Sequence, residues 1–451
     1  MGRMSILGAF LLLAAATPFD SAQGKQEASA FRAGFAESDI TPPIGIPMQG
    51  ANAKQRAEKV VDPLFARAAV FERGAELVGF IQLDLACISA EDTAAIRTRI
   101  AADHGTPAAR VMVTATHNHA GPAVIDEALP RDQAWVASMV EKASAVFGKA
   151  LEARQEAQAG AASVFEWEVS FNRRIVMRDG TVRTHGSFKS PDALRFEGPI
   201  DPEVAVYAVR GKDGKIAGAI VNFACHPGHY WAKCILSGGY PGAVARALKE
   251  KGVPVTLFLQ GAAGNMHHQD PRGFPEKTLE EIGQRLADDA EKAIGKIKWK
   301  APSRISARSK TLEIPYRMPT EADLQGTAKG AQRFGEKGYY DRKIAELLEG
   351  IKKKNGVEPA EVQVFRLDDV AFAAQPSESF AEHGLRIKEE TSPERTFVVC
   401  YANGMLGYLP HVEGFKRGGY EATFGPPSCM APDAGDRLAD AAIELIRATR
   451  P

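Results

Sequence analysis

Short apolar runs alternate along the chain with stretches of helical periodicity. Apolar and β-branched residues fill 77–85 and 111–116, and such runs predict strands. Residues 91–104 and 135–153 instead carry apolar positions at the spacing of an amphipathic helix. Strand and helix keep alternating to the C-terminus, which predicts the α/β class and one large mixed domain rather than several.

The rest of the chain repeats this pattern without a break in composition. Residues 205–209 and 216–223 predict a hairpin that turns at Lys212-Asp213-Gly214. Residues 320–355 are rich in Glu and Lys and predict a pair of solvated surface helices. Further strands are expected at 255–260, 362–374 and 397–401, and further helices at 240–251, 279–297 and 435–449.

The N-terminus has the pattern of an export signal. Arg3 precedes an apolar run from Ile6 to Ala16, and the small residues Ser21 and Ala22 follow. The run is shorter than the roughly 20 residues that a spanning helix needs. We expect residues 1–29 to be a signal peptide and linker, residues 30–451 to be the catalytic domain, and the mature protein to be secreted or periplasmic without a transmembrane segment. An uncleaved membrane anchor is the alternative.

Charge and cysteine content exclude several classes. The 56 basic and 56 acidic residues cancel, and no basic patch interleaved with aromatics points to a nucleic-acid partner. The five cysteines form no CxxC pair, which argues against a cysteine zinc site. Buried free thiols are expected, with a Cys225–Cys234 disulfide as the alternative.

Four predicted strands end in polar, glycine-flanked loops, where catalytic residues of α/β proteins gather. His117 and His119 follow the first strand, and His226 and His229 follow the second. The third loop runs from Gly261 to Asp270, and the fourth carries Glu378. These loops hold six of the ten histidines, namely 117, 119, 226, 229, 267 and 268.

Such a cluster of imidazoles is hard to explain by core packing. Two histidines and a carboxylate from different strands would suit zinc and leave a position for water. Each loop also has a plainer explanation, as hydrogen-bonded loop histidines, a tight glycine turn or a carboxylate at a helix N-terminus. No HExxH, GxSxG or P-loop motif occurs, which argues against thermolysin-like proteases, α/β-hydrolases and P-loop enzymes.

Several segments resemble the catalytic domain of the neutral ceramidase family, and most closely its short bacterial members. They include Ala33-Gly-Phe-Ala-Glu-Ser-Asp-Ile-Thr-Pro-Pro-Ile-Gly45 and Thr116-His-Asn-His-Ala-Gly-Pro122. Asn403-Gly-Met-Leu-Gly-Tyr408 and Gly419-Tyr420-Glu421 follow in the same order. Because the chain stops at Pro451, we expect the immunoglobulin-like domain of full-length members to be absent.

The resemblance implies a zinc site and a set of roles around it. The matching ligands are His117, His226, Glu378 and Tyr408. His119 corresponds to a proton donor or acceptor beside the metal, and Arg173 and Tyr420 to contacts with the polar head of the substrate. Where ceramidases carry a serine that touches the scissile amide, this chain has His267, which we expect to help position the substrate and its oxyanion.

The expected function is therefore zinc-dependent hydrolysis of an N-acyl amide by metal-activated water, on a small-molecule or lipid substrate. The departure at His267 motivates an alternative, the hydrolysis of an ester or lactone of a carbohydrate-derived substrate. A third hypothesis is that the chain is a binding or adhesion protein that has kept the fold without catalysis.

Overall fold

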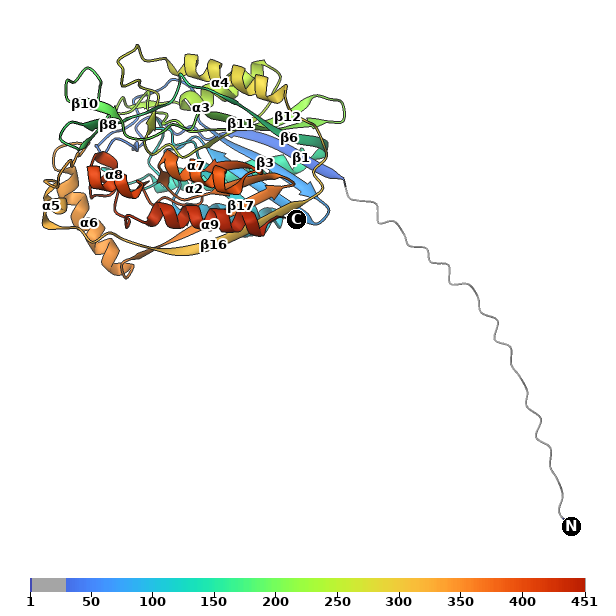
Figure 1. Ribbon diagram of the computed structural model, residues 1–451. Coiled ribbons are helices and arrows are strands. Elements are labelled where there is room, and N and C mark those ends of the chain that lie inside the picture. Colours follow the sequence, from blue (N-terminus) through green and yellow to red (C-terminus); the bar gives the residue numbers. More distant parts are fainter. Residues whose placement is uncertain (2–29, 451) are drawn as a thin grey trace.

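The computed structural model describes residue 1 and residues 30–450, and two large sheets dominate this part of the chain (Figure 1). The larger sheet has eight strands in the order β14 (Thr256–Gln260), β12 (Ile216–Phe223), β11 (Glu203–Gly211), β6 (Gln155–Phe165), β1 (Phe31–Asp39), β3 (Phe65–Arg73), β4 (Glu76–Leu83) and β5 (Val111–Ala115). The smaller sheet has four, in the order β16 (Ile305–Pro315), β17 (Val357–Leu367), β18 (Val370–Ala374) and β20 (Arg395–Val399).

Helices cover the outer faces of both sheets, so the molecule has four layers (Figure 1). The larger sheet packs against α1 (Ala90–His104), α2 (Gln133–Glu152), α3 (Gly239–Glu250) and α4 (Leu279–Ile294). The smaller sheet packs against α7 (Ala381–Thr391) and α9 (Ala434–Ala448).

Shorter elements complete the described residues and supply most of the loops near the site. The helices are α5 (Glu321–Gln325), α6 (Tyr339–Lys353) and α8 (Val412–Arg417), with 3-10 turns η1 (Ala108–Arg110) and η2 (Tyr420–Ala422). The short strands are β2 (Lys59–Val60), β7 (Phe171–Asn172), β8 (Arg174–Met177), β9 (Val182–Thr184), β10 (Ala193–Phe196), β13 (Ile235–Leu236), β15 (Met266–His267), β19 (Glu378–Ser379) and β21 (Tyr408–Leu409).

The core follows from the two-residue period of the strands. Phe80 of β4 faces the smaller sheet, where its ring centroid lies 5.3 Å from that of Phe365 and 5.0 Å from that of Phe372. The next residue, Ile81, faces the helices instead. Because successive side chains point to opposite faces, strands that are buried on both sides read as continuous apolar runs. This is the pattern from which they were predicted.

The predicted α/β class is confirmed, and most predicted elements lie within a few residues of their expected bounds. Two predictions were wrong in part. Residues 362–374 form parts of two strands, β17 and β18, because Asp368 turns the chain with a φ of 51°. The segment 320–355 contains α5 and α6, but the loop between them reaches inward, where Phe334 lines a cavity together with Arg173 and His226.

The cysteine prediction can be checked directly, because all five cysteines lie among the described residues. All five are free thiols, four of them buried, and Cys225 and Cys234 are not joined. The predicted signal peptide, at residues 1–29, lies almost entirely outside the described residues. Among the helices that the structure describes, none combines the length and apolar character needed to cross a membrane.

Candidate active site and metal centre

The strand-end loops of both sheets converge on one point. His117 follows β5 and His226 follows β12, both in the larger sheet. Glu378 lies just after β18 of the smaller sheet, and β19 pairs in parallel with β21 so that Glu378 stands opposite Tyr408. The structure therefore brings together the four residues that the sequence predicts as metal ligands, although they span 291 positions between Tyr408 and His117.

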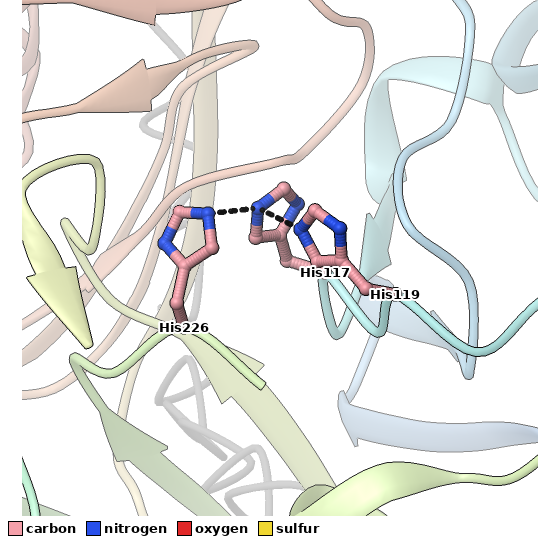
Figure 2. A group of neighbouring side chains, drawn as sticks. All are labelled: His117, His119 and His226. Atoms are coloured by element: carbon pink, nitrogen blue, oxygen red, sulfur yellow. Dashed lines mark hydrogen bonds between the residues drawn. The ribbon is translucent and has the colours of Figure 1, made fainter. Parts of the chain in front are cut away.

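Three histidines point the same ring nitrogen at one another (Figure 2). Nδ1 of His117, His119 and His226 lies 2.8, 3.0 and 2.8 Å from the backbone carbonyls of Ala86, Gly50 and Ala263. Each Nδ1 therefore carries the proton in the neutral ring, which leaves a lone pair on Nε2. The Nε2 atoms of His117 and His226 are 2.8 Å apart, and those of His119 and His117 are 3.1 Å apart.

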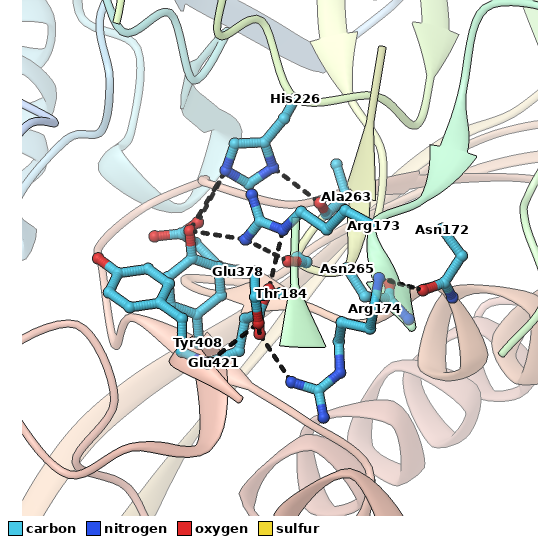
Figure 3. A network of polar contacts seen from close by, with 12 residues as sticks. Asn172, Arg173, Arg174, Thr184, His226, Ala263, Asn265, Glu378, Tyr408 and Glu421 are labelled. Carbon is cyan, nitrogen blue, oxygen red and sulfur yellow. Dashed lines mark hydrogen bonds and ion pairs between the residues drawn. The ribbon is translucent and has the colours of Figure 1, made fainter. Parts of the chain in front are cut away.

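Glu378 and Tyr408 add oxygen atoms to this cluster (Figure 3). Glu378 Oε2 lies 3.1 Å from His117 Nε2 and 3.5 Å from His226 Nε2, and it is buried without a hydrogen-bond partner in the described part of the chain. The Tyr408 hydroxyl lies 3.3 Å from His226 Nε2. Acceptor atoms crowded in this way repel one another unless a cation lies among them, and imidazole and carboxylate donors suit zinc. The residues present thus fit a divalent metal.

The backbone at His117 is held in an uncommon conformation. Its φ of 63° lies in the left-handed region, which non-glycine residues rarely occupy. The ring stacks on Tyr401, with centroids 4.0 Å apart and an angle of 18° between the planes. Tyr401 is fully buried and itself has a φ of 55°. Such strained residues gather at functional sites, where the surrounding packing fixes them.

His119 is the histidine of this cluster that lines both cavities beside it. Burial, and next the neighbouring His117, hold the pKa of His119 well below its ordinary value. The ring is therefore neutral at physiological pH, with the Nε2 lone pair free to accept a proton. The same atom lies close enough to those of His117 and His226 to be a third imidazole ligand.

Arg173 is fixed by a buried ion-pair network (Figure 3). Its Nε donates to Glu421 at 2.8 Å, and its Nη2 donates to the Gly264 carbonyl and the Tyr408 hydroxyl at 2.8 and 3.1 Å. Glu421 also accepts from Arg174 at 2.7 Å. Burial would raise the pKa of Glu421, but Arg173 and Arg174 outweigh it and lower the pKa to about 2. Nη1 of Arg173 takes part in none of these contacts.

Arg173 also faces the predicted ligand Tyr408. Burial, and next Glu378, raise the pKa of the Tyr408 phenol well above its usual value, while Arg173 opposes them. A cation beside the hydroxyl would act in the same direction as Arg173. A bound cation would thus join Arg173 in favouring the ionised oxygen of Tyr408, against the effects of burial and Glu378.

Two cavities meet at the cluster. The main cavity, of about 490 Å³, is lined by Arg173, His226, His267 and Trp231 among others. The smaller, of about 280 Å³, is lined by His117 and Glu378 together with apolar side chains and the charged side chains of Glu127, Lys354 and Glu358. Side chains common to both are those of Asn52, His119, Tyr408 and Tyr420. The candidate ligands thus form part of the boundary between two spaces, each lined by both polar and apolar side chains.

The other predicted site residues lie in the main cavity. The Tyr420 hydroxyl accepts a hydrogen bond from Asn52 at 3.0 Å. Nδ1 of His267 accepts from the backbone N–H of Gln269 at 3.0 Å, which places the ring proton on Nε2. The His267 ring centroid is 6.3 Å from that of His226, so His267 lies beside the cluster without joining it.

Sequence reasoning assigned no role to three residues that shape the site. Tyr401 stacks on His117, Glu421 anchors Arg173, and Asn52 holds Tyr420. Glu421 could have been noticed, because it directly follows a predicted site residue. Tyr401 and Asn52 give no such signal, since their roles depend on contacts across more than 280 positions of the chain.

Fold and site together define a four-layer α/β protein with a buried cluster of nitrogen and oxygen atoms suited to a divalent cation. Residues 31–254 match the sequence model of the neutral/alkaline non-lysosomal ceramidase family, N-terminal part. This confirms the resemblance expected from the sequence, and the chain is a member of that family. None of the curated proteins matches the chain in a sequence search.

Solved structures of ceramidases share the fold. The neutral ceramidase from Pseudomonas aeruginosa is 19% identical, with a TM-score of 0.73 over 94% of this chain and 75% of that one. A structure described as ceramidase complexed with C2 is 20% identical, with a TM-score of 0.74 over 94% of this chain and 76% of that one. At this identity the likeness establishes the architecture alone.

Proposed function

We propose that this protein is a zinc-dependent hydrolase that cleaves N-acyl amides of the ceramide class. The observation that carries the proposal is the convergence of three imidazole Nε2 lone pairs with the unpartnered Oε2 of Glu378. His117, His226, Glu378 and Tyr408 would hold the ion. Family membership supports the choice of an acyl amide as the bond that is cleaved.

A bound Zn²⁺ ion lowers the pKa of a water from 15.7 to about 7 and polarises the substrate carbonyl. His119 supplies the proton transfer, because its Nε2 is a free acceptor beside the reacting point. It takes the proton of the water as the oxygen attacks the acyl carbon. It then gives that proton to the nitrogen as the carbon–nitrogen bond breaks, and a carboxylic acid and an amine leave, the acid passing its own proton to the amine or to solvent.

Three further residues orient the substrate. Arg173 has Nη1 to offer, His267 has its Nε2–H, and Tyr420 stands where the two cavities meet. Donors of this kind, fixed beforehand by their own hydrogen bonds, stabilise negative charge on the carbonyl oxygen as it develops.

The two cavities suit the two parts of an acyl amide. Ile125, Leu347, Met405 and Leu406 line part of the smaller space and would take an acyl chain there, although Glu127, Lys354 and Glu358 also face this space. The main cavity would take the polar head. A substrate that crosses from one to the other places its amide bond at the cluster, because both cavities share His119 and Tyr408.

Replacement of His117 by Ala tests the proposal. The variant should lose bound zinc and hydrolysis of N-acyl amides together, while the folded fraction measured by circular dichroism is kept. Replacement of His104, which binds the Ser144 carbonyl away from the cluster, is the matched control and should change neither. Full zinc content and activity in His117→Ala would refute the proposal.

The lining of the main cavity favours a second candidate, hydrolysis of an ester or lactone of a carbohydrate-derived substrate. Arg173, Lys233, His185 and Gln269 offer hydrogen bonds to hydroxyl and carboxylate groups, and Trp231 offers an aromatic face. A panel of N-acyl amides and acylated sugars, compared by kcat/KM, separates the two. Higher values for the sugars would favour the second.

We further propose that residues 30–451 act as one catalytic domain and that the protein is exported. The basic, apolar and small-residue pattern before residue 23 supports export. Secretion of a reporter fused after residue 29 tests it, with Ile6–Ala16 deleted as the control.

A further inference from the structure

A second group of metal-binding side chains lies at the rim of the main cavity, apart from the predicted zinc ligands. His229 follows β12, His268 follows β15, and Glu276 lies in the loop before α4. One ligand atom from each lies within 4.8 Å of the others. None of the three belongs to the family motifs or to the mechanism above.

His268 is the most constrained member of this group. It is 4% exposed, and neither of its ring nitrogens makes a hydrogen bond within the described part of the chain. Nδ1 lies 3.0 Å from Glu276 Oε1, close but without the alignment of a hydrogen bond. A buried polar atom without a partner destabilises the folded state, so a ligand that satisfies these nitrogens would be favoured here.

His229 presents a second unsatisfied nitrogen. Its Nε2 lies 3.0 Å from the Lys277 carbonyl and must donate to it, which leaves a lone pair on Nδ1. That Nδ1 is buried without a partner among the described residues. The ring stacks on His268, with centroids 3.7 Å apart and 7° between the planes.

A proton alone does not satisfy the group. If His268 turns an N–H toward Glu276, its Nε2 and the Nδ1 of His229 remain buried and unpaired. A cation can use both imidazoles and the carboxylate at once. The lone pairs of two parallel rings do not converge, so the rings must rotate out of the stack to bind one ion, which the soft χ2 torsion of histidine allows.

We propose that His229, His268 and Glu276 bind a second divalent transition-metal ion, of the zinc type. Two imidazoles and one carboxylate suit such ions, whereas Ca²⁺ and Mg²⁺ prefer oxygen ligands alone. His229 and Glu276 both line the main cavity, so the open coordination positions of the ion face the space that would hold the polar part of a substrate. The site goes beyond the proposed hydrolysis and does not depend on it.

Metal content per chain tests the site without any substrate. Purified wild type, equilibrated with a small excess of Zn²⁺ and then freed of unbound metal, is measured by mass spectrometry. We expect two ions in wild type and one in each of His268→Ala, Glu276→Gln and His117→Ala. The double variant of His117 and His268 should bind none, and the His104→Ala control should bind two.

Glu276→Gln keeps the test decisive if His268→Ala fails to fold, because the Glu276 side chain is nearly half exposed. Wild-type zinc content in both Glu276→Gln and His268→Ala would overturn the inference. If both lose one ion while His117→Ala loses none, the second site stands and the proposed catalytic centre fails. If His117→Ala loses one ion while Glu276→Gln and His268→Ala lose none, the proposed catalytic centre stands and the second site fails.

Discussion

His119 is the residue whose role the geometry defines least uniquely, because its Nε2 could receive either a proton or a metal ion. We expect His119→Ala to lower kcat by about 10²- to 10⁴-fold, the usual contribution of a general acid–base. Zinc content should stay at the wild-type level, because the predicted ligands are intact. Steady-state kinetics and metal analysis on the same preparation measure both.

The contrast with His117→Ala makes this prediction specific. Loss of zinc in His119→Ala, to the extent seen in His117→Ala, would show that His119 is a ligand. The proton transfer would then belong to another group in the cavity.

Glu421 pairs with both Arg173 and Arg174 in the buried network around the site, and Arg174 also pairs with Glu197. Removal of one partner from such a buried pair costs about 3–5 kcal/mol, since it leaves an uncompensated charge. Glu421→Gln should lose about this much free energy of unfolding in urea. Glu413→Gln, which removes the exposed ion pair with Lys416, should leave the unfolding midpoint unchanged.

The same carboxylate predicts a pH dependence of stability. Its ordinary pKa is 4.5 and its pKa in the folded protein is about 2. Since the folded-state pKa is lowered, the stabilisation by the ionised group is complete above pH 4.5 and is lost as the pH falls toward 2. The stability difference between wild type and Glu421→Gln should therefore shrink from about pH 5 to about pH 3. A constant difference over this range would contradict the assignment.

At the scale of single residues, the sequence predicts the candidate ligands better than it predicts the residues that hold those ligands in place. Histidines and a glutamate at the ends of apolar strands are visible as candidate ligands in a single sequence. Tyr408 needed the family resemblance, because a lone tyrosine carries no metal-binding signal. The stack of Tyr401 on His117 could not be predicted, since it depends on how two sheets meet.

Among the elements, the loop after β14 packs tightly against the segment that carries Glu378. A Cβ built on Gly264 would lie 2.4 Å from the carbonyl oxygen of Glu378, a backbone atom that cannot move freely. Gly264→Ala should push this loop away from β19, displace Glu378, and reduce both zinc affinity and kcat. Zinc titration with a competing chelator measures the first effect.

Gly350 gives a matched glycine control. It lies inside α6, and a Cβ there would meet nothing within 4 Å. Gly350→Ala should leave zinc affinity unchanged and raise stability by up to about 1 kcal/mol, because alanine favours a helix. Equal zinc affinities in the two variants would argue against the tight approach at Gly264.

Elements in which apolar residues follow a clear pattern were predicted well, and elements without such a pattern were missed. The helices α1, α2 and α9 and the strands β4, β5 and β12 lie close to their expected bounds. The long strands β6 and β16 were not predicted, since their residues are small or charged and follow no simple alternation. The α5–α6 segment was predicted as a surface, yet its loop reaches the cavity because Phe334 packs beside Tyr420.

On the scale of the whole molecule, stability depends on the apolar layer between the two sheets. Phe372 is fully buried there, with ring centroids 4.7 Å from Phe397 and 5.0 Å from Phe80. Phe372→Ala should cost about 3–5 kcal/mol in the free energy of unfolding. Phe274→Ala, at a side chain that is 64% exposed, should change it by less than about 0.5 kcal/mol. Chemical denaturation measures both.

Metal content separates this packing effect from an effect on the site. The folded fraction of Phe372→Ala should bind as much zinc as wild type, because no ligand contacts the ring. The sequence could predict that strands such as β5, β14 and β18 are buried on both faces, from their continuous apolar runs. The sequence could not predict that the two sheets pack on each other, because this packing depends on the complementary shapes of the side chains that face each other.

The candidate ligands come from both sheets, so two of them lie in the N-terminal part of the chain and two in the C-terminal part. His117 and His226 are encoded before α6, and Glu378 and Tyr408 after it. A protein cleaved in the loop before α6 would leave each fragment with half of the donor atoms. Neither piece alone could hold the ion firmly, so recovery of tight zinc binding on mixing would report directly on reassembly of the two halves.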